Sequence, residues 1–209
     1  MDGITTVKRS VKDDDGRELL KISSDSLAPT GCDAADTFYK KLEHDFMKGC
    51  DGILLPKARK KAGESSFRPF GAVRRLTIAM DSPALLSVVC DVSIFDGNTR
   101  VSQRRSENWD KANGFLLSFG DVFSAKAEKE LKRLISDNAR GADNGSRRYY
   151  SDYQNLLMRH FSRRDFFVTE QNIGFYYQPN SIGPSDRPFV FLIPTAVLKE
   201  RSLIKSSLF

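Results

Sequence analysis

The sequence predicts an α+β fold in which an antiparallel sheet carries about three helices on one face. Two apolar patterns occur in the same chain: alternation at every second residue, typical of strands, and recurrence at three and four residues, typical of helices. The two patterns do not alternate regularly along the chain, as they would in a parallel α/β fold. With 209 residues, of which 40% are hydrophobic and 15 are Phe, the chain can fill a sizeable core.

The N-terminal part is expected to contain two strands, a helix and a third strand. The acidic run Lys12–Gly16 predicts a turn between two strands. A calcium-binding loop is not expected there, because the run lacks the spacing of calcium ligands. Apolar residues at helical spacing predict a helix from Asp33 to Gly49. Pro56–Ser66 is rich in Lys, Arg, Gly and Ser, so we expect an exposed connection there and a candidate boundary between two halves. A strand is expected over Val73–Met80.

A β-hairpin follows. Leu85–Phe95 places apolar residues on one face, and Asp96-Gly97-Asn98 supplies turn chemistry because Gly and Asn tolerate a positive φ. Thr99–Trp109 is then expected to return as the antiparallel partner. Most positions of this returning strand are polar, so neither of its sides resembles a core face.

The C-terminal part is expected to hold two helices and three short strands. Asp121 stands ahead of a helix that Ser124 would cap and Gly141 would end, with a Gly/Asp/Asn/Ser loop after it. A third helix is indicated by the apolar spacing between Tyr149 and Phe161. The strands are expected at residues 166–169, 173–177 and 189–193.

The charge pattern indicates ordinary solvated surfaces. The formal net charge is +6, and basic residues come in short scattered groups such as Arg74-Arg75 and Arg104-Arg105. We therefore do not expect nucleic acid as a partner, although a cytoplasmic nucleic-acid-binding protein stays an alternative. No apolar run could span a bilayer, and none follows Lys8 and Arg9 as in a secretory signal. The protein is expected to be cytoplasmic if the chain is complete, and extracytoplasmic if a signal has been removed.

No catalytic, metal or cofactor motif is present. The odd set of Cys32, Cys50 and Cys90 has no C-x-x-C spacing and is expected to be free thiols. His44 and His160 fall on predicted helices in surface or core-edge positions. We expect no cofactor and no metal, and we favour a protein that is not an enzyme. A hydrolase with a carboxylate pair placed by the fold stays open, because such pairs have no local signature.

Three segments resemble a bacterial domain of unknown function. They are Leu86-Ser87-Val88 before the hairpin, Asn108-Trp109-Asp110 with Phe119–Phe123, and Phe167-Val168-Thr169 through Ile173–Tyr177 to Ile182-Gly183-Pro184 and Ile193-Pro194. This pattern is similar to the domain found at the C-terminus of RsiV-type anti-sigma factors and beside the catalytic domain of some peptidoglycan deacetylases. The resemblance covers residues 85–209, and residues 1–84 would be the strand-helix half that precedes it in one compact protein.

The resemblance implies a non-enzymatic binding or sensing module of the cell envelope, with cell-wall glycan or an envelope protein as its partner. One departure is the turn at Phe95–Arg100, which lacks the His and one of the Gly residues of the family pattern. The polar returning strand presents hydrogen-bond donors beside aromatic rings, which suits a glycan or an acidic protein. The candidate ligand-binding residues are Phe95, Asn98, Arg100, Arg104 and Trp109. An edge strand kept polar to prevent aggregation is the alternative reading of the same pattern.

Overall fold

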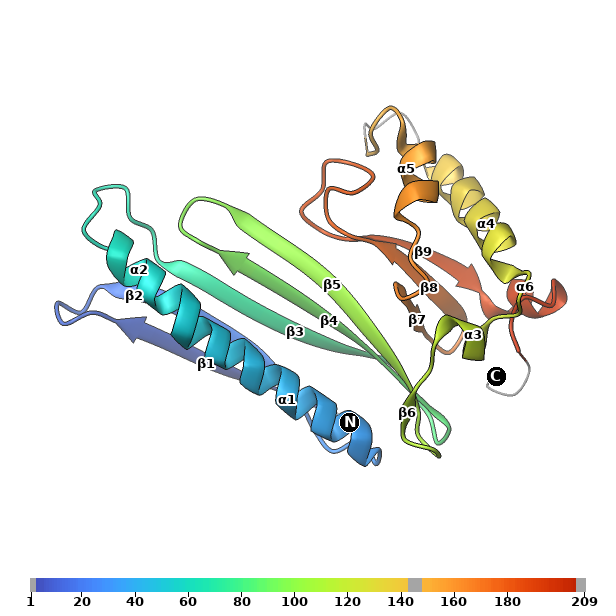
Figure 1. The fold of residues 1–209 in the computed structure, drawn as a ribbon, viewed down its shortest axis with the longest axis horizontal. Helices are drawn as coiled ribbons and strands as arrows, with labels where there is room; N and C mark the ends of the chain where they lie inside the picture. The colour runs from blue at the N-terminus through green and yellow to red at the C-terminus, as the bar shows by residue number, and fades with distance from the viewer. Residues whose placement is uncertain (1–2, 143–147, 206–209) are drawn as a thin grey trace. The chain divides into compact units, whose positions relative to one another are not determined.

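The computed structural model describes residues 3–142 and 148–205. Its helices and mostly antiparallel strands confirm the predicted α+β class (Figure 1). The strands form two sheets where the sequence predicted one: a six-stranded sheet in the order β1-β2-β3-β4-β5-β6, and a three-stranded sheet in the order β7-β8-β9.

The chain divides into two compact units, and each unit is discontinuous in sequence. Unit 1 comprises the residues up to Thr77 together with Cys90–Gln103, and unit 2 comprises Ile78–Val89 together with the residues from Arg104 onward. The long strands β3, β4 and β5 therefore each contribute to both units. The predicted boundary between an N-terminal half, residues 1–84, and a C-terminal half, residues 85–209, stays a prediction.

Unit 1 begins with a hairpin of β1 (Ile4–Lys12) and β2 (Glu18–Leu27). At its turn the backbone N–H of Arg17 donates to Asp13 Oδ1 at 2.7 Å, and Gly16 has a φ of +80°. The acidic run is thus a turn, as predicted, and one of its carboxylates satisfies a backbone donor.

A helical crossover connects β2 to β3 (Phe70–Asp81), which runs parallel to it with Leu20 opposite Phe70. The crossover consists of α1 (Asp33–Gly49), the π-helical turn η1 (Cys50–Leu54) and α2 (Leu55–Lys61). Parallel neighbours require such a crossover, whereas antiparallel ones need only a tight turn. This pair is the exception to the predicted antiparallel pairing.

The expected exposed connection at Pro56–Ser66 is wrong over its first half. Pro56 lies in the first turn of α2, where its missing N–H costs nothing, and the preceding turn widens so that Leu55 N–H donates to the Cys50 carbonyl. Ala58 is fully buried. Helix α2 therefore belongs to the core of unit 1, whose buried members also come from β2, η1 and β3: Leu19, Leu20, Ile22, Cys50, Ala58, Phe70 and Ala72.

The predicted hairpin of β4 (Leu85–Phe95) and β5 (Arg100–Asp110) is confirmed. Asp96 N–H donates to the Thr99 carbonyl at 3.1 Å, and Gly97 adopts a φ of +92°. The expectation that neither side of the returning strand is core is wrong at its end. There Glu107, Asn108 and Trp109 are buried, because this end of β5 belongs to unit 2 and is covered by its strands.

Unit 2 contains β6 (Phe115–Leu116), α3 (Phe119–Val122), α4 (Ala127–Ala142), α5 (Tyr153–His160) and α6 (Thr195–Glu200). The predicted cap at Ser124 is wrong: α4 begins three residues later, and Ser124 Oγ donates to the Ser202 carbonyl at 3.1 Å. Helix α4 also continues through Gly141. The loop predicted after it extends over residues 143–147, which lie outside the described residues.

The three C-terminal strands are confirmed as β7 (Phe166–Val168), β8 (Asn172–Tyr177) and β9 (Phe189–Pro194). Side chains such as Ile173 and Phe175 pack on one side of this sheet with Leu131 and Ile135 of α4. On the other side Tyr176 packs with its neighbours Val89, Phe167, Ala79 and Val190. Both faces of the smaller sheet are therefore covered.

Candidate functional site: a basic groove on the open face of unit 1

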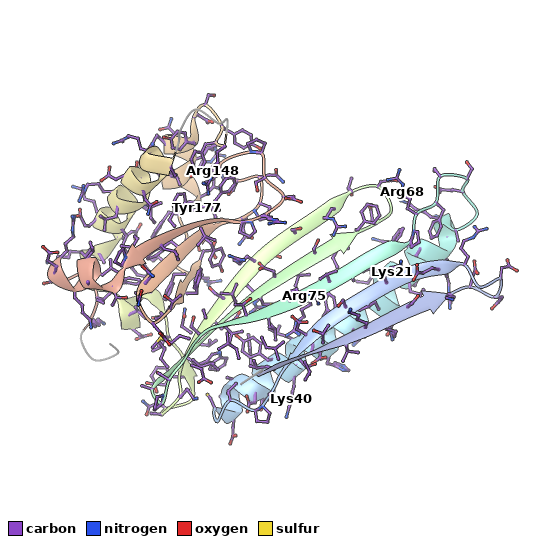
Figure 2. All side chains as sticks on the ribbon, turned by 180° about the vertical axis from the view of Figure 1, so that it is seen from behind. Lys21, Lys40, Arg68, Arg75, Arg148 and Tyr177 are labelled. Carbon is purple, nitrogen blue, oxygen red and sulfur yellow. The ribbon has the colours of Figure 1, made fainter. Side chains whose placement is uncertain are left out.

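The helices of unit 1 cover one face of its sheet and leave the other face open. Alternation places Leu20 and Ile22 of β2 against the helices, so Lys21 and Ser23 point to the open face. The neighbouring strands contribute the residues opposite those two: Ser10 and Lys8 of β1, and Gly71 and Val73 of β3. Figure 2 shows this face, with Lys21 and Arg75 labelled.

A groove of about 660 Å³ runs over this face. It is rich in cations, which come from β1, β2, β3 and the start of β5, and Glu18 is the one acid among the described residues that line it. The cations that point to the open face are Lys8, Lys21, Arg75 and Arg100, and Arg9 borders the groove with its side chain directed to the helix face. Apolar residues, among them Pro69, Val73 and the ring of Phe95, share the lining with these charges, which suits an extended ligand with negative charge.

Intramolecular ion pairs neutralise only part of this charge. Lys21 Nζ lies 2.7 Å from Glu18, and Arg75 Nη1 lies 3.1 Å from Asp25 Oδ1. Arg9 pairs with Asp51 of η1. Hydrogen bonds from Lys21 and Ser10 lower the pKa of Glu18, so this carboxylate stays ionised. Within the described chain Lys8 and Arg100 have no carboxylate within ion-pair distance, and they give the groove its excess positive charge.

Phe95 and Arg100 form the aromatic corner of the groove. The guanidinium carbon of Arg100 lies 5.5 Å from the centroid of the Phe95 ring, and Arg100 Nη1 donates to Ser93 Oγ at 3.1 Å. Gly71 lies beside Phe95, and a Cβ there would be 3.7 Å from Phe95 Cβ. The glycine therefore places no side chain of β3 beside Phe95 at this position.

Asn98 is exposed and belongs to the turn that supports this corner. Its backbone N–H donates to Asp96 Oδ1 at 3.0 Å, and the N–H of Thr99 donates to the same oxygen at 2.8 Å. These bonds, with that of Thr99 the stronger, lower the pKa of Asp96. The contribution of Asn98 seen here is to the geometry of the turn.

Arg104 and Trp109 belong to unit 2 and have other surroundings. The side-chain amide of Gln178 accepts from Arg104 N–H at 2.9 Å and donates to the Arg104 carbonyl at 2.8 Å, as a neighbouring strand would. The Arg104 guanidinium lies 5.9 Å from the Tyr176 ring centroid. Trp109 is only 4% exposed, so its ring presents no open stacking surface.

A second polar cluster surrounds Tyr176 in unit 2. Ser106 Oγ donates to the Phe166 carbonyl at 2.6 Å and lies 3.2 Å from the Tyr176 hydroxyl. Burial raises the pKa of Asp165 above its ordinary value, opposed by a hydrogen bond from Gln178. Burial also raises the pKa of Tyr176, with Asp165 and Glu107 adding to the rise. If the protein were a hydrolase, Asp165 would thus be the first candidate for a catalytic carboxyl group.

Other kinds of site have less support. In the residues that the structure describes, no group of three His, Cys, Asp or Glu side chains could hold a metal ion. The three cysteines are free thiols, as predicted, all three are buried, and Cys90 is a small core residue. His44 and His160 are exposed on α1 and α5. No helix in the described ranges is long and apolar enough to cross a membrane.

Sequence reasoning missed the N-terminal contribution to the groove. Lys8 and Ser10 on β1, and Lys21 and Ser23 on β2, repeat a polar residue at every second position, which is the signal that could have revealed them.

The basic groups were all expected on solvated surfaces, and this prediction is wrong for Arg74. This side chain is 1% exposed and donates from Nη1 to the Asp25 carbonyl.

Comparison with known proteins finds solved structures with a similar fold. No protein-family model and no curated protein matches the chain. A DUF3298 family member from Bacteroides fragilis superposes with a TM-score of 0.67 at 14% identity, covering 97% of this chain and 92% of that one. A DUF3298 family protein from Pseudomonas aeruginosa PAO1 gives 0.62 at 15%, covering 99% and 96%.

These similarities show the fold alone, because both identities are low. DUF3298 is a bacterial domain of unknown function, so the predicted resemblance to such a domain is confirmed at the level of fold. The narrower link to RsiV-type anti-sigma factors and peptidoglycan deacetylases stays a prediction.

Proposed function

We propose that this protein is a non-enzymatic binding module that holds an extended anionic glycan of the cell envelope in the basic groove of unit 1. The observation that carries the proposal is the composition of the groove: four cations whose side chains share the open sheet face, one acid and the Phe95 ring. Sugar rings stack on aromatic faces, and cations attract the carboxylates of wall polymers.

The shape of the groove supports a polymer over a small apolar molecule. Small-molecule pockets are concave, enclose most of their ligand and are lined mainly by apolar side chains. Here the groove lies open on a sheet surface, and charged side chains, Ser10 and Ser23 share its lining with apolar residues such as Pro69, Val73 and Phe95. A chain lying across the strands could contact several of these side chains at once, each contributing little.

The test is retention on peptidoglycan. The wild-type protein, the double variant Phe95→Ala, Arg100→Ala and the control Lys40→Ala are compared for binding to soluble peptidoglycan fragments. Lys40 is an exposed cation of α1 outside the groove (Figure 2). We expect the double variant to bind roughly tenfold or more weakly, since aromatic and cationic contacts of about 1 kcal/mol each are lost. Lys40→Ala should bind as the wild type does.

Salt and competitors separate the alternatives. Binding through the groove should weaken as ionic strength rises, because exposed charges are screened. Equal retention of the wild type and the double variant would exclude the groove as the binding site. Release of new reducing ends from the fragments would instead support the hydrolase alternative, and displacement only by single-stranded nucleic acid would support the nucleic-acid alternative.

A further inference from the structure

Strand β1 forms one edge of the six-stranded sheet. It pairs along its whole length with β2, from Ile4 opposite Leu27 to Lys12 opposite Glu18, and it stands first in the strand order. In Figure 2 it is the blue strand along the edge of this sheet. Its outer side thus presents main-chain groups for which β2 can supply no partner.

The pairing shows which groups these are. The N–H of Ala28 donates to the Gly3 carbonyl at 2.8 Å, so Gly3 belongs to the residues that bond to β2. In an antiparallel ladder such residues alternate with residues whose N–H and C=O point away from the partner. Ile4, Thr6, Lys8 and Ser10 therefore direct their main-chain groups outward. The register shift comes only between Val11 and Lys12.

Exposed edge strands are normally protected by shortness, proline or bulges. β1 has nine residues, no proline and no irregularity before Val11, so it offers a continuous template. Its one protective feature is positive charge from Lys8, Arg9 and Lys12, with no acid between Ile4 and Lys12. Positive charge repels a second β1 strand but attracts an acidic one.

We propose that β1 binds an extended acidic segment of a partner protein, which adds to the sheet as a further antiparallel or parallel strand. Main-chain hydrogen bonds to Thr6, Lys8 and Ser10 would hold it, and its acidic side chains would meet Lys8 and Lys21 on the open face. A second copy of this chain fits less well, because self-pairing would bring the cations of two β1 strands together. This site goes beyond the glycan groove, since it uses the backbone of the sheet edge.

Substitutions at Thr6 test the backbone contribution without changing charge. Thr6→Pro removes an outward N–H and keeps the bonds to β2, and edge strands tolerate proline in such positions. Thr6→Val is the matched control, because both variants lose the hydroxyl that donates to Asp25 Oδ1 at 2.8 Å, but Val keeps the N–H. Thr6 does not line the groove, so failure of this proposal is distinguishable from failure of the glycan proposal.

The probe is a nine-residue peptide of alternating Glu and Val with blocked ends, measured by fluorescence anisotropy against its Lys counterpart. We expect the acidic peptide to bind the wild type and Thr6→Val about equally, and Thr6→Pro roughly tenfold more weakly, because an added strand loses a hydrogen bond and meets the proline ring. The Lys peptide should not bind.

Hydrogen exchange supplies the second measurement. Peptide binding should slow exchange at the amides of Thr6, Lys8 and Ser10 and leave Thr5 and Val7, which already bond to β2, unchanged. Equal binding to Thr6→Pro and Thr6→Val, or no binding of the acidic peptide to the wild type, would overturn the proposal. So would a homodimer that Thr6→Pro dissociates, because the occupant of the edge would then be a second copy.

Discussion

The two units use β-sheet in opposite ways. In unit 1 the helices cover one face, and the other face is polar, basic and open. In unit 2 the small sheet is covered on both faces, so β8 is buried along nearly its whole length, from Ile173 to Tyr177. A face that no layer covers can take a ligand, whereas a sheet covered on both faces offers neither face to one. The comparison therefore directs the search for function to unit 1.

The largest expected difference between the units is in how much free energy of unfolding is lost when an aromatic ring is removed. Phe175 of β8 is 1% exposed and touches several other rings, so Phe175→Ala should destabilise the protein by about 3–5 kcal/mol. Phe95→Ala on the open face should cost about 1 kcal/mol or less, because its ring is only partly buried. Urea unfolding curves of the two variants measure both values. Similar losses would show that the open face contributes to the core.

Glycines in the two sheets provide a smaller contrast. At Gly174 of β8 an added Cβ would lie 2.3 Å from the buried ring of Phe167, so Gly174→Ala should cost about 1–3 kcal/mol through overpacking. At Gly71 of β3 the nearest atom would be Phe95 Cβ at an ordinary 3.7 Å. Gly71→Ala should be neutral or stabilise slightly, since alanine reduces the entropy of the unfolded chain. The melting temperature of each variant, compared with that of the wild type, tests both expectations. A Gly174→Ala variant as stable as the wild type would contradict tight packing in unit 2.

The smallest expected effects concern carboxylates that stabilise local turns, and here the units should behave alike. Asp121 accepts from Ser118 N–H at 2.8 Å and from Ser118 Oγ at 2.6 Å in the first turn of α3. Both bonds lower the pKa of Asp121, and the bond from the Ser118 hydroxyl has the larger effect. Asp96 of the hairpin turn also has a lowered pKa. Both groups are thus structural in the same way, although Asp121 serves α3 and not the following helix.

The expected pH dependence follows from that direction. A carboxyl group whose pKa is lower in the folded state contributes stability above its unfolded pKa, and this contribution is lost as pH falls through the folded pKa. Asp121→Asn and Asp96→Asn should therefore lower the melting temperature by a few degrees at neutral pH and by less at about pH 2. Thermal melts at both pH values test this. An effect that grows in acid would contradict the assigned role.

Local features were predictable from the sequence. The β4–β5 hairpin follows from strand alternation and from the positive φ that Gly97 permits, and both depend on residues adjacent in the chain. The same holds for α1 and for the C-terminal strands. The crossover was predicted only in part, because a composition rich in Lys and Arg at Pro56–Ser66 does not reveal that Ala58 is buried with residues of β2 and β3.

The tertiary structure decided how these elements combine. Phe95 and Arg100 were recognised as candidate ligand residues from the hairpin alone, but their neighbours Gly71, Lys21 and Lys8 come from strands distant in sequence. Trp109 was expected to be an exposed ligand-binding residue of the returning strand, yet β5 enters unit 2 before reaching it and the side chain is buried. Alternation along one strand determines which side chains share a face. Which face is then covered, and by which layer, depends on contacts between residues far apart in the chain, and a single sequence carries no local signal for those.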